Sequence, residues 1–398
     1  MKIIWLTIDA LLPMNTAGRM GVLKRLETVA ANNDVYLFYF YDEKNDNDET
    51  NCKLSQSCKE VNGYIKTTSK LSLVKNILRY PYTVSTRINE TMIRDIDKCI
   101  IDNDIELINI DFPQMGYALY RLKNSDNLKI IMNQHNIEWM RFKEMSKSKS
   151  ISLLKRFIMR IEGLRLKHFE ETLYTRIRFD AQTFVTQEDK SIFTQWTNLH
   201  NTRLEIFQGG GYYKKESIIE KKTSKEKSII FVGVMSNEFN PEGALWFARE
   251  VLPRIKQSID NVKFYIIGKD PIEKLKTLSD SSIIVTGFVE DLDVYYQLAD
   301  IVVIPILHGG GVKLKLLEAM GYNKIVVSTS QGVRGTDFID GESILIADDA
   351  KEFAKKCISV LNDPVAYDTL KKNAEDIFLS KYTWESIGAK YNKFLMSL

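Results

Sequence analysis

The sequence is poor in cysteine, the residue that builds disulfide frameworks and many metal centres. Its 398 residues include only four cysteines, namely Cys52, Cys58, Cys99 and Cys357. Their spacing matches no metal-binding pattern, and Cys52 and Cys58 both fall in a polar segment. We therefore expect structural or incidental thiols in a reducing compartment.

Long hydrophobic runs are absent as well. No segment has the ~18 consecutive apolar residues that a helix needs to cross a bilayer. Lys2 and the apolar residues after it imitate the start of a signal peptide, but Asp9 interrupts the run and no small-residue cleavage site follows. We expect a buried first strand and a cytoplasmic protein.

The sequence also lacks an excess of one charge. Its 55 Lys and Arg against 52 Asp and Glu give a net charge of +3, too small to indicate a nucleic-acid partner. No Gly-x-Gly-x-x-Gly fingerprint is present, which counts against a dinucleotide enzyme. Hydrophobic and charged contents of 44% and 27% are those of an ordinary soluble protein, and the length suits two domains.

What the sequence does contain is a series of short apolar runs that alternate with helical patterns. Near-continuous apolar strands favour parallel sheets covered on both faces, so we predict two doubly wound α/β units in tandem, facing each other across a cleft. The charged segment 212–227 has linker composition, and 42–59 is expected to be a long surface loop. The predicted strands are 3–7, 35–41, 105–110, 128–132, 181–185, 228–232, 262–267, 283–286, 301–304, 325–328 and 344–346.

The segment 301–321 is the most informative. A β-branched run predicts a buried strand, three glycines follow, and a helix is predicted over Val312–Met320 with Lys313, Lys315 and Glu318 in it. Cations are disfavoured at a helix N-terminus unless an anion lies between them and the backbone amides. Glycines let the chain approach that anion closely. The pattern predicts a phosphate-bearing ligand.

A series of short segments follows one another in the order typical of a known family. These segments are Phe231–Met235, Asn240–Phe247, Phe264–Gly268, Thr286–Asp291, Ala299–Asp300, Gly309–Gly321, Val326–Gly332, Gly341, Ala347–Asp348 and Tyr382–Trp384. In this order they resemble the retaining GT-B glycosyltransferases of family four, which include many bacterial capsule and cell-wall sugar transferases.

The resemblance implies an acceptor-binding domain over 1–211, joined by a C-terminal helix at 383–398, and a donor-binding domain over 212–382. It implies transfer of a sugar from a nucleotide sugar to a saccharide, lipid-linked or protein acceptor with retained configuration. It also implies that no metal or other cofactor is required. Catalysis would consist mainly of positioning and stabilisation of the departing diphosphate.

Site residues follow from the same resemblance. Glu318 is similar to the second glutamate of the family's Glu-x7-Glu pattern, which binds the donor ribose, whereas the first glutamate falls on Gly310. The loop 235–241 lacks the Arg and Lys of many relatives, so Lys313, expected to be catalytic, and Lys315 would contact the diphosphate; a Lys315–Glu318 salt bridge is the alternative for Lys315. The expected donor-binding residues are Gly18, Asn240, Phe288, Val289, His308, Gly309, Gly310, Gly311, Val312, Lys315 and Glu318.

In the first half, His135 follows a predicted strand and is the second expected catalytic residue, placed near the donor sugar. The alternative is a structural histidine, with Asn136 as the expected cap of the next helix. Arg19, in a predicted loop at 16–21, and Asp111 are the expected acceptor contacts. Arg19 could equally be a solvated surface residue.

The basic segment 146–168 carries an apolar stripe, formed by Leu154, Phe157, Ile158 and Ile161, among lysines and arginines. Such a helix can lie on an anionic membrane surface, or it can pack its stripe on its own sheet. Two other functions stay open. The missing glutamate at Gly310 allows a catalytically silent partner of another transferase, and a nucleotide-sugar epimerase would need acid/base carboxylates that the sequence does not reveal.

Overall fold

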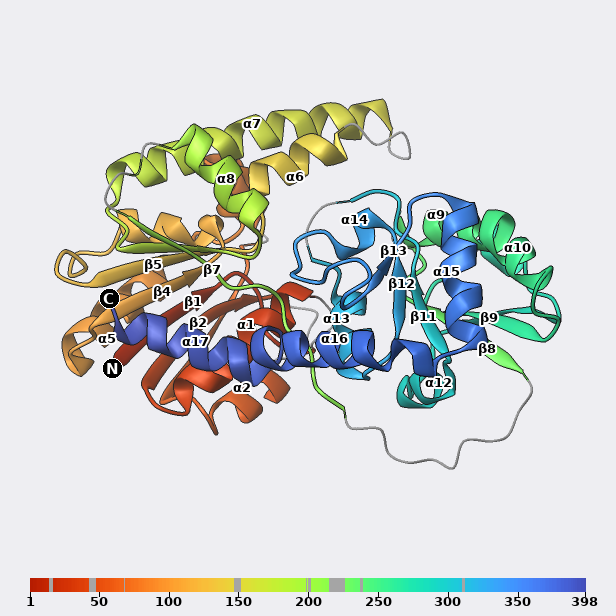
Figure 1. Ribbon diagram of the computed structural model, residues 1–398. Helices are drawn as coiled ribbons and strands as arrows, with labels where there is room; N and C mark the ends of the chain where they lie inside the picture. Colours follow the sequence, from red (N-terminus) through yellow and green to blue (C-terminus); the bar gives the residue numbers. More distant parts are fainter. Residues whose placement is uncertain are drawn as a thin grey trace. The chain divides into compact units, whose positions relative to one another are not determined.

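The structure is a computed structural model that describes residues 1–13, 17–42, 48–67, 69–146, 152–197, 199, 202–214, 226–236, 239–309 and 312–398. It contains two compact units, Met1–Gln208 with Gly388–Leu398 and Gly209–Ile387 (Figure 1). The first residues of the predicted linker belong to the second unit, where the Tyr213 hydroxyl hydrogen-bonds Glu375 and Lys214 pairs with Asp293.

The first unit is built on a parallel sheet in the order β3-β2-β1-β4-β5-β6-β7. Its strands are β1 (Lys2–Thr7), β2 (Asp34–Tyr41), β3 (Glu60–Ile65), β4 (Leu107–Asp111), β5 (Lys129–Gln134), β6 (Ala181–Phe184) and β7 (Arg203–Ile206). Its helices are α1 (Ala17–Ala30), α2 (Asp48–Leu54), α3 (Lys70–Ile77), α4 (Tyr82–Ser85), α5 (Glu90–Asn103), η1 (Pro113–Tyr120), α6 (Glu138–Met145), α7 (Leu153–Arg176), α8 (Gln187–Trp196) and most of α17 (Trp384–Met396).

Each face of this sheet has its own apolar core, because successive side chains of a strand point to opposite faces. In β1, Ile4 and Leu6 join the core with α5 and α7, whereas Ile3 and Trp5 join the core with α1 and α17. Figure 1 shows α6 and α7 side by side over the sheet. The strand order reverses between β1 and β4, and in open α/β sheets ligands bind at the carboxyl edge beside such a reversal.

The second unit repeats this plan with six parallel strands in the order β10-β9-β8-β11-β12-β13 around one continuous core. The strands are β8 (Lys227–Val232), β9 (Val262–Ile267), β10 (Ile283–Gly287), β11 (Ile301–Ile304), β12 (Val326–Ser328) and β13 (Leu345–Ile346). The helices are α9 (Phe239–Trp246), η2 (Phe247–Val251), α10 (Leu252–Lys256), α11 (Glu273–Lys276), α12 (Asp293–Leu298), α13 (Leu314–Gly321), α14 (Ser330–Val333), α15 (Ala350–Asn362), η3 (Val365–Tyr367) and α16 (Asp368–Lys381). Its order reverses between β8 and β11.

All eleven predicted strands are present, and the two doubly wound units are confirmed. Three local predictions were wrong. The expected loop 42–59 contains α2. The segment around Gly18 and Arg19 forms the first turn of α1 rather than a loop. Ile137, not Asn136, is the residue that precedes α6, and it makes no side-chain cap hydrogen bond.

Candidate functional site

Glycines line the carboxyl edge of the second sheet beside β8. Gly268 has a φ of +144°, and a Cβ built on it would lie 1.8 Å from the carbonyl oxygen of Gly233, so only glycine fits there. A Cβ on Gly233 would lie 2.8 Å from Asn240 Nδ2 and 3.0 Å from Lys315 Nζ. The side chains of Asn240 and Lys315 therefore occupy the space beside Gly233.

That pair is Lys315 with Asn240. Asn240, near the start of α9, donates from Nδ2 to the carbonyl of Val234 at 2.8 Å and accepts a hydrogen bond from Lys315 Nζ. The Lys315 ammonium also lies 4.9 Å from the centroid of the Phe231 ring, within cation–π distance. Lys315 is half-buried in the first turn of α13 and does not form the alternative salt bridge with Glu318.

Burial and, to a lesser extent, the neighbouring positive charge of Lys313 lower the pKa of Lys315 to about 7, against a smaller raising effect of Glu318. Within the part of the chain that the structure describes, the Lys315 ammonium has no carboxylate in an ion pair. A cation that is desolvated, placed beside another cation and located at the positive end of a helix is stabilised by a bound anion. The electrostatics therefore favour an anionic ligand at this position.

Lys313 directly precedes α13 and donates from Nζ to the carbonyl of Gly309 at 3.0 Å. Gly309 has a φ of +103°, and a Cβ on it would lie 3.0 Å from the Phe239 ring. This hydrogen bond from Lys313 stabilises the turn that follows β11. Gly310 and Gly311 lie outside the described residues.

One turn further along α13, Glu318 is half-buried and accepts a hydrogen bond from the Tyr296 hydroxyl at 3.1 Å. Tyr296 is fully buried and stacks on Tyr322 with ring centroids 4.0 Å apart. Burial raises the pKa of Glu318, an effect that the Tyr296 hydrogen bond partly offsets. A rigid aromatic pair therefore fixes the direction of this carboxylate.

The other expected donor residues differ in exposure. The His308 side chain is exposed and its Nε2 lies 3.6 Å from Glu242. Phe288, after β10, is 73% exposed, whereas Val289 packs partly against the core and Val312 does the same just before α13. The exposed Phe288 ring lies after a strand of the sheet and can offer a stacking surface to a ligand. The Val289 side chain has no aromatic ring and cannot.

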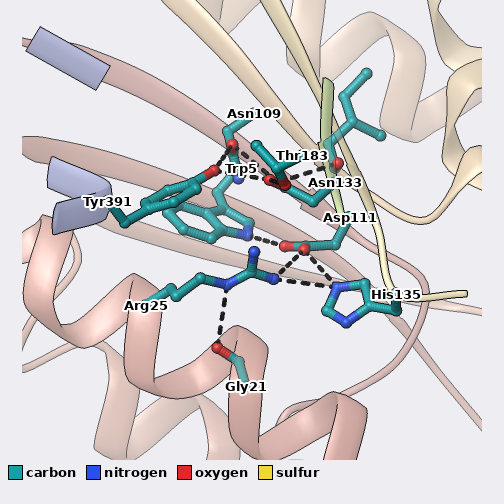
Figure 2. Close-up of polar contacts among 10 residues, drawn as sticks. Trp5, Gly21, Arg25, Asn109, Asp111, Asn133, His135, Thr183 and Tyr391 are labelled. Carbon is teal, nitrogen blue, oxygen red and sulfur yellow. Dashed lines mark hydrogen bonds and ion pairs between the residues drawn. The ribbon is translucent and has the colours of Figure 1, made fainter. Parts of the chain in front are cut away.

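The first unit has its own polar cluster at the corresponding reversal point, drawn in Figure 2. Asp111, the last residue of β4, is fully buried. It accepts hydrogen bonds from Trp5 Nε1 at 2.5 Å and from Arg25 Nη2 at 2.9 Å, and it contacts His135 Nε2 at 2.8 Å. Both carboxylate oxygens of Asp111 are therefore engaged within the cluster.

His135 follows β5, and its Nε2 contacts two groups of the cluster. The Asp111 carboxylate can only accept a hydrogen bond and favours a proton on Nε2, whereas the Arg25 guanidinium, 3.1 Å from the same nitrogen, can only donate and favours the opposite tautomer. Burial lowers the pKa of His135 more strongly than Asp111 raises it, and the positive charge of Arg25 lowers it as well. The lowered pKa favours a neutral imidazole, which has one acceptor nitrogen.

Phe112 holds the other side of this imidazole. The two rings stack with centroids 4.1 Å apart and an angle of 16° between them. Phe112 has a φ of +72°, which is costly for a bulky residue, and such strain is concentrated at functional sites. A Cβ on Gly18 would lie 3.5 Å from the Phe112 ring, so α1 contacts the same group. Arg19 is half-buried in α1.

Helix α17 contributes Tyr391 to the cluster, and its ring lies 5.3 Å from the Arg25 guanidinium. The Tyr391 hydroxyl hydrogen-bonds Asn109 Oδ1 at 2.6 Å and Asn133 Oδ1 at 2.9 Å (Figure 2). Asn133 Nδ2 also donates to Asn109 Oδ1 at 3.0 Å. The C-terminal helix is thereby bonded to the strands that carry Asp111 and His135.

The supporting residues Trp5, Arg25, Tyr296 and Tyr391 were not predicted from the sequence. Arg25 had one usable signal, since it lies among the apolar positions Val22, Leu26 and Val29 of α1, where an unpaired arginine would be disfavoured. No group of three or more His, Cys, Asp or Glu that could hold a metal ion occurs among the described residues.

Comparisons with known proteins agree with this architecture. Residues 226–363 match the family described as Glycosyl transferases group 1. The chain is 27% identical over 371 residues to an uncharacterized 44.6 kDa protein in the cps region of Klebsiella pneumoniae, a match that covers 90% of each.

Two solved structures share the fold over the whole chain. Sucrose-phosphate synthase from Thermosynechococcus elongatus superposes with a TM-score of 0.68 at 17% identity, covering 100% of this chain and 98% of that one. HepE of Anabaena in complex with UDP-glucose superposes with a TM-score of 0.65 at 14% identity and 100% coverage of both chains. The fold is therefore GT-B, and the family match supports a group 1 glycosyltransferase.

Proposed function

We propose that the chain transfers a sugar from a nucleotide-sugar donor to a saccharide, lipid-linked or protein acceptor with retention of configuration. The observation that carries the proposal is the desolvated Lys315 cation, held by Asn240 beside Gly233 and followed one turn later by Glu318. A cation and a carboxylate at this spacing suit a diphosphate and a ribose on one ligand. HepE was solved with UDP-glucose, so uridine donors are the first to test.

The reaction assigns complementary tasks to the two clusters. Lys315, the Lys313 backbone and the α13 N-terminus would stabilise the negative charge that develops on the departing diphosphate. His135, held neutral, would form a hydrogen bond with a sugar hydroxyl, while Asp111 and Arg25 hold the imidazole in place through Nε2. No metal ion or other cofactor has a role in this proposal.

The experiment begins with a thermal-shift screen against a panel of nucleotide sugars. The donor that stabilises the chain is then supplied with candidate saccharide acceptors, and the anomeric configuration of the product is read by NMR. An axial donor linkage that gives an axial product supports retention. Inversion would refute that part of the proposal while leaving the donor site intact.

A catalytically silent partner protein is the alternative that the glycine at position 310 favours, because many relatives place a carboxylate there. The two functions differ in turnover, not in binding. A donor that binds but is neither hydrolysed nor transferred, alone or with any acceptor tested, would select the silent partner.

A further inference from the structure

Helix α7 presents two apolar faces, and only one of them packs against the first unit. The inner face holds buried Leu166, Phe169 and Leu173. The outer face of its first three turns carries side chains that are 42–79% exposed, namely Leu153, Leu154, Phe157, Ile158, Ile161 and Leu164. Because a monomeric soluble protein rarely leaves so many adjacent large apolar side chains in water, this face calls for a partner.

A second exposed apolar segment lies against the same helix. Arg165 of α7 donates to the carbonyls of Ile77 and Tyr80, and Glu162 accepts from the Thr83 amide at 3.3 Å. These bonds place the segment from α3 to α4 beside the middle of α7. The segment contributes Val74, Leu78 and Tyr82, which are 63%, 85% and 55% exposed. We call the two sets together the outer apolar patch.

The two segments that carry the outer apolar patch are basic. Lys75 and Arg79 flank its α3 side, and Lys155 and Arg160 are exposed on α7. Among the residues that the structure describes, these four form no ion pair. From Thr67 to Ile88 there is no acidic residue, and from Ser146 to His168 the single one is Glu162, which is buried and faces inward.

We infer that the outer apolar patch is a docking surface for an anionic lipid bilayer. Large apolar side chains that enter the acyl boundary, ringed by cations at the level of the headgroups, are the chemistry of interfacial helices. A protein that binds this patch would need an apolar groove lined by acidic residues. An anionic bilayer supplies both the apolar region and the negative charges over a flat area. No helix among the described residues is long and apolar enough to cross a membrane, so the chain would lie on the surface.

The inference extends the sequence-based expectation for segment 146–168, of which residues 147–151 lie outside the described part. It adds α3 and α4, which the sequence analysis did not connect with α7. It does not depend on the proposed transferase activity, because lipid binding is measured without donor or acceptor.

The test is flotation of the full chain with vesicles of phosphatidylcholine alone or with an equal amount of phosphatidylglycerol. We expect binding to the anionic vesicles that weakens with salt, and little binding to the neutral ones. The double variant Leu154→Ser/Phe157→Ser should lose roughly a hundredfold in binding, because each side chain contributes about tenfold or more when buried. Lys155→Glu/Arg160→Glu should lose more than about twentyfold, at roughly fivefold per cation removed.

The matched control is Lys98→Glu/Ile101→Ser on α5, which alters an exposed lysine and a 63% exposed isoleucine of the same unit outside the patch. It should bind vesicles as the wild type does. Unchanged circular dichroism and thermal midpoints exclude misfolding of the patch variants. Absence of wild-type binding to anionic vesicles would overturn the inference. So would sedimentation showing that the wild type self-associates through the patch and that the patch variants are monomeric.

Discussion

At the scale of single residues, the most consequential side chain is Lys315, because its charge is poised to change near neutral pH. Burial lowers its pKa to about 7, and a bound diphosphate would raise that pKa again by favouring the charged form. Donor binding would then be coupled to uptake of one proton at Lys315.

We therefore predict that donor affinity is highest below pH 7 and falls by up to about tenfold per pH unit above it, as free Lys315 loses its proton. The nucleotide-sugar diphosphate stays doubly negative over this range and contributes no slope of its own. Titration calorimetry between pH 6 and pH 9 measures the effect. Lys315→Met should bind more weakly and show a flat profile; a wild-type profile in that variant would contradict the assignment.

The strained backbone of Phe112 gives a second residue-scale prediction. Phe112→Ala keeps the unfavourable φ and loses the ring, so its free energy of unfolding should fall by about 3 kcal/mol or more. Phe112→Gly loses the same ring but tolerates that φ, so it should be more stable than Phe112→Ala by about 1 kcal/mol. Both should reduce turnover equally, because both lose the stack on His135. Urea unfolding and initial rates measure the two effects, and equal stability of the two variants would argue against strain.

At the scale of elements, the sequence predicted every strand of the second sheet, including its edges β10 and β13, and missed only the two edge strands of the first sheet. The strands β1, β4, β8 and β11 have neighbours on both sides and are buried on both faces, so each reads as a continuous apolar run. The two missed strands, β3 and β7, are edge strands with half-exposed or exposed residues. Their pairing is decided by the neighbouring strand and not by their own composition.

The candidate site also contains residues that could be predicted from the sequence and residues that could not. Residues that follow a strand, such as Asp111 and His135, could be found because the carboxyl edge of a parallel sheet is a predictable position. Their partners could not, because Arg25 and Trp5 lie 86 and 106 residues from Asp111 in the chain. Such contacts arise from packing and leave little local pattern.

Helix α17 provides the element-scale prediction. Tyr391→Phe removes one buried hydroxyl, while Asn109 Oδ1 and Asn133 Oδ1 each keep a second donor, Asn133 Nδ2 and Thr183 Oγ1, so the loss costs about 0.5–1.5 kcal/mol. The thermal midpoint should fall by roughly 1–6 °C. Tyr367→Phe, which loses an exposed hydrogen bond to Ser359, is the control and should unfold like the wild type. If both variants unfold at the wild-type temperature, the Tyr391 network does not anchor the helix.

At the scale of the whole molecule, two units with separate cores allow ligand binding to be localised. A donor bound at the carboxyl edge of the second sheet should slow amide exchange in β8, α9 and α13, by an amount set by its saturation. Helix α5 of the first unit should exchange at its ligand-free rate. Hydrogen-exchange mass spectrometry, with the donor found by thermal shift, measures these exchange rates. Protection confined to residues 1–208 would place the donor in the first unit and contradict the prediction.

The central claim, that the group around Lys315 and Glu318 binds a nucleotide sugar, is tested most directly by titration calorimetry of the full chain. We predict that at least one nucleotide sugar binds the wild type, that Lys315→Met and Glu318→Ala each weaken it by about tenfold or more, and that Lys276→Met, which alters an exposed lysine of α11, leaves it unchanged. Wild-type affinity in both Lys315→Met and Glu318→Ala would contradict the account.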